Sequence, residues 1–165
     1  RTNVPAAWIA SMYGGASNTK ILHNRIIKTP GGNSDFKVFR MGSSGCSNCV
    51  AKGVRFRSNT IIGGEFDMSI TDQDHDYSVS WSLTVQLKDK KGRPLKQALI
   101  EVMDRHNQKV FSGKTNDEGL ISTDLKAMEF RNGSNSELTP FTIVAGKIKR
   151  VVTLPNDTHV ELVVK

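Results

Sequence analysis

The sequence predicts an all-β chain with a different kind of β structure in each half. Val, Ile, Thr, Ser, Asn and Gly are frequent, whereas Leu and Ala, which favour helices, are sparse. Residues 77–165 hold short alternating segments separated by turn signals, and residues 1–76 hold a repeat spaced by 35 residues. We therefore expect the last coils of a parallel β-helix, followed by a seven-stranded β-sandwich.

The second half is predicted to be the sandwich. Residues 80–87 alternate polar and apolar side chains with period two, as a half-buried strand does. Further short apolar runs follow at 98–102, 109–111, 120–125, 141–145, 149–154 and 160–164. Turn signals separate them, such as those at 89–94 and 115–119. Strands at this spacing are typical of a β-sandwich.

Residues 83–165 also resemble a known group of modules. The resemblance rests on four segments: Leu83–Asp89, Gly92-Arg93-Pro94-Leu95, Ala98–Val102 and Ser112–Gly119. Gly92 and Pro94 suit a hairpin, Ala98 is small enough to let two sheets approach, and Gly119 suits a tight turn. The segment is similar to the transthyretin-like and carboxypeptidase-regulatory-like sandwiches of secreted bacterial proteins. The resemblance implies an Ig-like or transthyretin-like fold, and it implies little about function.

The first half repeats a pattern in which apolar residues precede an Asn, followed by a polar residue and Ile-Ile. The two copies centre on Asn24 and Asn59. This rhythm is typical of a right-handed parallel β-helix, where an Asn at a bend tolerates left-handed geometry and bonds in a ladder. We expect the coils to end near residues 66–70. The predicted domains are thus residues 1–76, the terminal coils, and residues 77–165, the sandwich.

Coils followed by this sandwich resemble the C-terminal end of secreted β-helix proteins, many of them polysaccharide lyases or hydrolases. The resemblance implies an extracellular or periplasmic location. Solenoids need about three or more repeats with caps. Because the sequence starts at Arg1 without a Met or a signal-peptide pattern, we expect the remainder of a larger parent chain to be a partner of this segment.

The net charge of +7 does not by itself indicate a nucleic-acid partner. Residues 1–82 hold nine Lys/Arg and six Asp/Glu, and residues 83–165 hold fourteen and ten, so the charge is shared by both halves. Basic residues alternate with acidic ones, and the dense spots at 88–91 and 147–150 coincide with expected surface turns. We therefore expect no nucleic acid. We also expect no membrane span, because no apolar run reaches the ~20 residues required.

Carbohydrate binding is the expected role of several side chains in the first half. Arg55 and Arg57 alternate with Val54 and Phe56, so both arginines can project from one face of a strand towards a polysaccharide, acidic polysaccharides included. Trp8 and Tyr13 are candidates to stack on sugar rings. The simpler interpretation is that the arginines lie on a solvent-facing β surface.

Two other motifs could carry chemistry. Asp72, Asp74 and Asp76 alternate in a loop and could bind Ca²⁺, although Tyr77 and Leu83 replace the Gly and Glu of an EF-hand. The alternative is a polar linker with Asx turns, and we expect no other cofactor. Cys46 and Cys49 form a C-x-x-C followed by a strand, and no second pair is present. A short-loop disulfide or two free thiols is therefore favoured over a redox or zinc site.

These observations predict a non-catalytic portion of a secreted protein, which caps the coils and associates with carbohydrate. Two alternatives stay open. The chain could contribute groove residues such as His23, Arg55 and Arg57 to a polysaccharide lyase or glycoside hydrolase, whose chemistry needs a base and a cation. It could also be an extracellular adhesion or filament-assembly module that joins others by strand addition.

Overall fold

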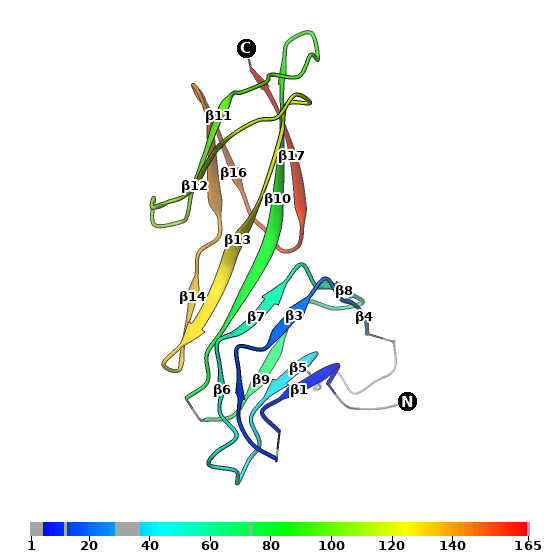
Figure 1. The fold of residues 1–165 in the computed structure, drawn as a ribbon, viewed down its shortest axis with the longest axis vertical. Helices are drawn as coiled ribbons and strands as arrows, with labels where there is room; N and C mark the ends of the chain where they lie inside the picture. Colours follow the sequence, from blue (N-terminus) through cyan, green and yellow to red (C-terminus); the bar gives the residue numbers. More distant parts are fainter. Residues whose placement is uncertain (1–4, 12, 29–36, 73, 165) are drawn as a thin grey trace. The chain divides into compact units, whose positions relative to one another are not determined.

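The computed structural model of the chain describes residues 5–11, 13–28, 37–72 and 74–164 (Figure 1). These residues form strands, turns and loops and no helix, which confirms the predicted all-β fold class. They divide into two compact units. Unit 1 comprises residues 1–79 and 129–136, and unit 2 comprises residues 80–128 and 137–165. No helix in the described ranges has the length and hydropathy needed to cross a membrane.

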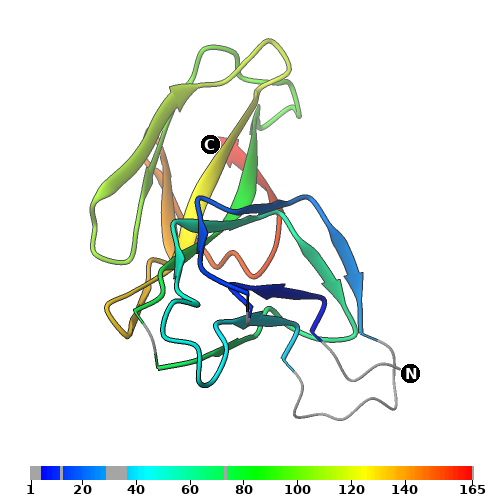
Figure 2. The ribbon, with the colours of Figure 1, turned by 60° about the horizontal axis from the view of Figure 1, so that its bottom comes forward.

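Unit 1 is a stack of coils whose short strands pair in parallel (Figure 2). Coil 1 contains β1 (Ala7–Ile9), β2 (Ala16–Ser17), β3 (Lys20–Leu22) and β4 (Arg25–Ile27). Coil 2 contains β5 (Phe39–Met41), β6 (Ala51–Lys52), β7 (Val54–Arg57) and β8 (Thr60–Ile62). Coil 3 contains β9 (Met68–Ile70) and the first residues of β10 (Tyr77–Asp89). Strands pair as β1-β5-β9, β2-β6, β3-β7-β10 and β4-β8, so each coil lies on the one before it.

The predicted spacing of 35 residues sets the register of three of these pairings. Ala16 pairs with Ala51, Lys20 with Arg55, and Arg25 with Thr60. The predicted Asn ladder is present in the same register. The Asn59 side chain accepts hydrogen bonds from the backbone N–H of Asn24 (3.1 Å) and from the Asn24 amide (3.0 Å), and it donates to the Ile21 carbonyl (2.6 Å).

One detail of the predicted bends is wrong. The residues with left-handed backbone are His23 (φ 55°) and Ser58 (φ 49°), which lie one position before the two asparagines. The asparagines therefore act through their side chains, which bond the backbone of the neighbouring coil. A second bend repeats in the same way at Asn18 (φ 54°) and Gly53 (φ 64°). A Cβ at Gly53 would lie 2.8 Å from Oδ1 of Asn18, so this bend needs a glycine where the two coils touch.

Inside unit 1 the core is largely aromatic. Phe39 and Phe56 are almost completely buried, and their ring centroids lie 4.7 Å apart. Phe66 packs against both at 5.2 and 5.1 Å. Tyr77 contacts Phe56 edge-on and stacks on Phe130 at 5.4 Å. Alternation explains this arrangement, because every second residue of each coil strand points inward and the residues between them point to solvent.

Unit 2 is a β-sandwich. One sheet orders β13 (Leu120–Arg131), β10 and β17 (Thr158–Val164), with β17 parallel to β10. The other orders β12 (Lys109–Lys114), β11 (Leu99–Met103), β15 (Phe141–Ala145) and β16 (Ile148–Val152), all antiparallel. Each predicted strand of the second half is present. The core is made by alternate buried residues, among them Leu83, Val85, Leu87, Ile100, Val102, Phe141 and Ile143.

In the second half of the chain, one strand is not predicted by the sequence. Residues 132–136, whose Gly, Ser and Asn are typical of a loop, include the turn Asn132-Gly133 and the start of β14 (Ser134–Glu137). Asn132 and Gly133 both have positive φ (49° and 73°), as a tight two-residue hairpin turn requires. β14 pairs with β13, and its residues are exposed throughout. A strand without a buried face shows no alternation of hydropathy in the sequence.

We predict that Asn59→Ala lowers the free energy of unfolding of unit 1 by about 2–4 kcal/mol, because it removes a buried amide that makes three hydrogen bonds between the coils. Asn24→Ala is the matched control. Its side chain is exposed, and we expect a loss of about 1 kcal/mol or less. Urea unfolding followed by Trp8 fluorescence, in a Trp81→Phe background, measures both losses. Equal losses in the two variants would contradict a specific role for Asn59.

Candidate functional site

The outer face of β3 and β7 carries the candidate binding residues. We call Lys20, His23, Arg55 and Arg57 the basic face. The parallel register places Lys20 directly beside Arg55 and Leu22 beside Arg57. Between the two arginines Phe56 points into the aromatic core, so Arg55 and Arg57 share the outer side of the strand. Neighbouring strands lie about 4.8 Å apart, which sets the spacing of the cationic groups across the face.

His23 and Arg57 are joined within this face. Nη2 of Arg57 lies 3.0 Å from Nε2 of His23. A guanidinium group only donates, so Nε2 must accept and the imidazole proton is assigned to Nδ1. The left-handed backbone at His23 brings the ring to this position at the end of β3. The contact lies at the exposed surface, and guanidinium N–H groups are the chemistry that binds carboxylate or sulfate oxygens.

Trp8 and Tyr13, the two predicted aromatic contacts, are not on β3 or β7. Trp8 lies on β1, where it is 40% exposed and its Nε1 donates to the Gly42 carbonyl at 2.7 Å. The Arg40 guanidinium lies 4.3 Å from the centre of the Trp8 ring, so a cation already covers part of the indole. Tyr13 is 94% exposed in a turn. The structure thus brings Arg55 and Arg57 together and leaves Trp8 in another sheet.

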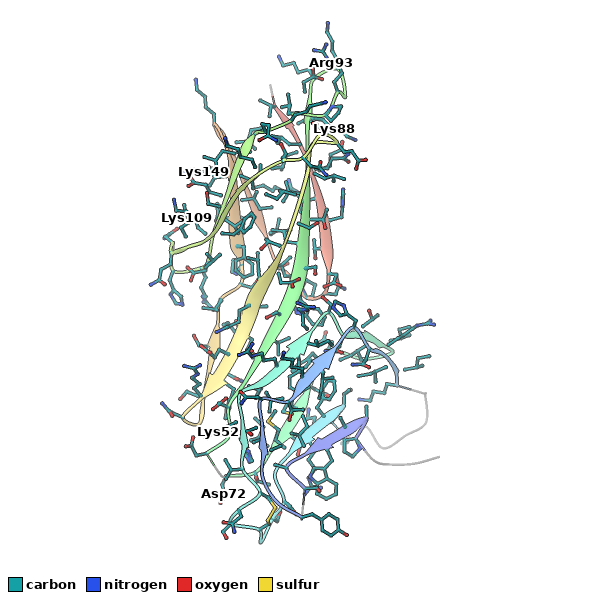
Figure 3. All side chains as sticks on the ribbon, in the orientation of Figure 1. Lys52, Asp72, Lys88, Arg93, Lys109 and Lys149 are labelled. Atoms are coloured by element: carbon teal, nitrogen blue, oxygen red, sulfur yellow. A yellow bond between two sulfur atoms is a disulfide. The ribbon has the colours of Figure 1, made fainter. Side chains whose placement is uncertain are left out.

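The acidic segment that could bind Ca²⁺ is occupied by a lysine. Nζ of Lys52 lies 2.7 Å from an Asp74 carboxylate oxygen and 3.8 Å from one of Asp76. A second oxygen of Asp76 accepts a hydrogen bond from the backbone N–H of Gly53. Asp72 is exposed (Figure 3). Within the described ranges, no three His, Cys, Asp or Glu side chains converge on a point that could hold a metal ion.

His75 lies in the same segment and is fully buried. Its Nδ1 accepts a hydrogen bond from the Ala51 N–H at 2.9 Å, and its Nε2 lies 2.9 Å from Oγ1 of Thr71. The neutral ring with its proton on Nε2 satisfies both contacts. Burial, followed by the charge of Lys52, lowers the pKa of His75, while Asp74 raises it. The sequence shows His75 only as one polar residue among acids, so nothing there indicates that it is buried.

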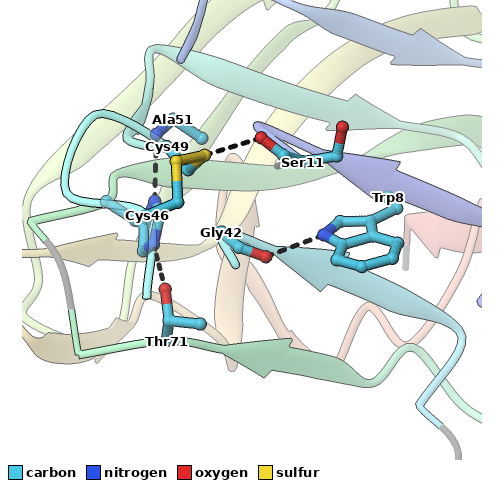
Figure 4. The surroundings of a disulfide bond; sticks show 8 residues. Trp8, Ser11, Gly42, Cys46, Cys49, Ala51 and Thr71 are labelled. Atoms are coloured by element: carbon cyan, nitrogen blue, oxygen red, sulfur yellow. Dashed lines mark hydrogen bonds between the residues drawn. A yellow bond between two sulfur atoms is a disulfide. The ribbon is translucent and has the colours of Figure 1, made fainter. Parts of the chain in front are cut away.

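Cys46 and Cys49 are joined by a disulfide within coil 2 (Figure 4). Sγ of Cys49 lies 2.7 Å from the Ser11 carbonyl oxygen, a contact between coils. A disulfide sulfur carries no hydrogen, so this contact is not a conventional hydrogen bond. The loop Ser43–Cys49 turns tightly, with the backbone N–H of Cys46 bonded to Ser43 and that of Cys49 bonded to Cys46. The bond holds this loop beside β6.

Unit 2 offers a cleft rather than a polar site. The cleft has a volume of about 920 Å³ and is mostly apolar, with Leu87, Leu95, Leu99, Ala145, Ile148 and Val163 in its lining. Glu101 and Lys147 supply its charge. The labelled cations of this unit in Figure 3 are spread along it, and Lys88, Arg93 and Lys109 each pair with a carboxylate.

The chain shows only weak similarity to the known proteins with which it aligns. No protein-family model matches the sequence, and no curated protein matches it. Two mutant crystal structures of the shaft pilin SpaA from Lactobacillus rhamnosus GG align at TM-scores of 0.42 and 0.38 with 12% and 13% identity. These alignments cover 51% and 52% of this chain and 46% and 49% of the pilin. The Bacillus anthracis TIE protein aligns at a TM-score of 0.41 with 19% identity, over 62% of this chain and 18% of that one.

The chain therefore spans less than half the length of each of these proteins. At TM-scores below 0.5 the likenesses establish neither a family nor a function for this chain.

We predict that unit 1 loses stability as the pH falls below about 6.5. The pKa of His75 is lower in the folded chain than in the unfolded chain, so the unfolded chain binds the proton first. The contribution of His75 to stability is therefore full at pH values above the pKa of this residue in the unfolded chain. It falls on acidification below that pKa, by up to about 1.4 kcal/mol per pH unit for this one group. Urea unfolding between pH 7.5 and 5 measures the slope.

His75→Gln serves as the control, because an amide can accept from Ala51 and donate to Thr71 without titrating in this range. We expect it to be less stable at pH 7.5 and to show a shallower slope. The same slope in both proteins would show that another group causes the pH dependence.

Proposed function

We propose that the chain is a non-catalytic extracellular module that binds an acidic polysaccharide on the basic face of its coils. The observation that carries the proposal is the β3–β7 register, which groups Lys20, Arg55, Arg57 and His23 on one outer surface. A polysaccharide with one carboxylate or sulfate per sugar presents anions at intervals comparable to the spacing of these side chains. Charge-assisted hydrogen bonds from guanidinium groups are the strongest contacts available to such anions.

The Cys46–Cys49 disulfide supports the extracellular placement. Disulfides persist in oxidising environments and are rare where thiols are kept reduced. The bond lies in a surface loop of coil 2, where Cys46 is accessible and would be open to reduction in a cytosol. An extracellular or periplasmic location is thus part of the proposal.

We also propose an organisation in two domains. Residues 1–76 form the coil segment, and residues 77–165 form a transthyretin-like sandwich that follows and caps it. Support comes from the start of β10, whose residues Tyr77–Val79 lie in unit 1 and pair beside β7. Tyr77 stacks on Phe130 and contacts Phe66, which closes this end of the aromatic core. An open ladder at this end would offer its strand edge to other chains.

We predict that Arg55→Gln combined with Arg57→Gln weakens binding to polygalacturonate and alginate by at least tenfold, as expected for the loss of about 1.4 kcal/mol or more of contact energy. Isothermal titration calorimetry measures the affinity. Neutral dextran should not bind, and added salt should weaken the binding to both acidic polymers.

The matched control is Lys149→Gln combined with Arg150→Gln, which removes the same charge from exposed positions of β16 in unit 2. We expect this pair to bind almost as the parent does. An equal loss in both double variants would reduce the proposal to net charge, and no binding by the parent chain would refute it. Release of unsaturated uronates by the parent, seen by absorbance, would refute the non-catalytic part and favour a lyase.

A second candidate function is assembly with other protein chains by strand addition, and the cleft of unit 2 favours it. β16 and β17 are each the last strand of their sheet in the described part of the chain, and both line the cleft. Leu99 and Val163 are 52% and 48% exposed there, so apolar surface lies next to free strand edges. An extended segment could add to either edge and place apolar side chains in the cleft.

If assembly is the function, Leu99→Lys combined with Val163→Lys should abolish a concentration-dependent rise in light scattering that the parent shows. Val110→Lys is the control, because Val110 is 42% exposed on β12 and does not line the cleft. A parent chain that stays monomeric at all concentrations would exclude self-assembly.

A further inference from the structure

Coil 1 of unit 1 is less well covered than coil 2, on which coil 3 lies. Inward residues of coil 2 are buried: Phe39 is 0% exposed, Ala51 is 0% and Phe56 is 1%. Their register partners in coil 1, which are Ala7, Ala16 and Ile21, are each only partly buried. At these three positions coil 1 leaves apolar surface that the described residues do not cover, whereas Ile9 of the same coil is buried.

The asparagine ladder shows the same asymmetry. Asn59 is 1% exposed and binds three groups of coil 1, namely the Asn24 N–H, the Asn24 amide and the Ile21 carbonyl. Asn24 holds the same position one coil earlier, 35 residues before, and it is exposed. Its amide N–H₂ donates to the Leu22 carbonyl and to Oδ1 of Asn59. Asn24 is thus placed to do for a preceding coil what Asn59 does for coil 1.

Backbone groups at this end are also available for pairing. The Thr19 carbonyl and the His23 N–H bond to β7, so by alternation the N–H groups of Lys20 and Leu22 point away from it. On β4 the Asn24 carbonyl and the Lys28 N–H bond to β8. By the same alternation, the N–H groups of Arg25 and Ile27 point away from β8. Within the described ranges β3 and β4 are each the last strand of their ladder on this side.

At the other end, coil 2 is mostly covered by the chain that follows it. β5 pairs with β9, and β7 lies beside the start of β10. The Ala51 N–H donates to Nδ1 of His75, and the Ala51 carbonyl accepts from the Asp76 N–H. β8 is the exception, since no strand follows it in the described part of the chain. Coil 2 is therefore covered along β5, β6 and β7, whereas no described strand lies before β3 and β4 of coil 1.

We infer that the exposed end of coil 1 is a docking surface for one more parallel coil of the same repeat, carried by polypeptide that precedes residue 5. A second copy of this chain does not fit the same geometry. Two copies meeting at this end through a two-fold axis would run antiparallel and lose the Asn register. Two copies stacked head to tail would collide with the start of β10, which already occupies the β7 edge. The inference is independent of what the basic face binds.

The test is a chain extended by a duplicate of residues 5–36 placed before residue 5, compared with the parent by hydrogen exchange. The duplicate supplies strands equivalent to β1–β4 and an asparagine equivalent to Asn24. We expect the amides of Lys20, Leu22, Arg25 and Ile27 to exchange at least tenfold more slowly in the extended chain. Amides of unit 2, such as those of β15, should exchange as in the parent.

The control is the same extended chain with the copies of Ile21 and Ile26 replaced by Asp, which has the same length but cannot bury its inner face. It should leave the amides of Lys20, Leu22, Arg25 and Ile27 as fast as in the parent. If the two extended chains behave alike, the surface does not accept a coil and the inference is wrong. Protection of the parent's amides that rises with protein concentration would instead identify a second copy as the occupant and overturn it.

Discussion

The structure of unit 1 depends on the register between its coils, and the side chain of Asn59 is the contact that depends on it most. This amide reaches from coil 2 into the backbone of coil 1, and its three hydrogen bonds form only when the coils are offset by 35 residues. A slip by one residue would exchange the inner and outer faces of every strand. Phe56 would then face solvent and Arg55 would face the core. The aromatic core and the basic face are thus two results of one alignment.

This coupling means that binding and stability use the same short strand. β7 packs Phe56 against Phe39 and Phe66 and carries an arginine on either side of it in sequence, so the core fixes where the cations lie. A ligand that bridges Lys20 and Arg55 would hold together the two strands that this register joins. Strands of two to four residues gain little from their own hydrogen bonds, so the stack relies on side chains that cross between coils.

The sequence predicts correctly the elements whose buried residues recur at a regular spacing along the chain. The run Ser80–Leu87 alternates because one side of β10 is buried along its whole length, and the two Asn-centred segments repeat because their coils have equal length from Ala16 to Ile62. β1 and β5 escaped notice because three residues are too few to show a period. Trp8 was grouped with Arg55 because sequence does not show which sheet a short strand joins. The burial of His75 depends on a contact with Ala51 that no local pattern encodes.

The parallel pairing of β17 with β10 gives unit 2 a mechanical property. Residues 83–89 of β10 run alongside residues 158–164 of β17 in the same direction. The chain therefore enters this ladder at one end and leaves it at the opposite end. Tension applied between residues 80 and 164 would pull the two strands past each other and load all the hydrogen bonds of the ladder together, in shear. If β17 ran antiparallel to β10, the same tension would break the hydrogen bonds of the ladder one after another, at a much lower force.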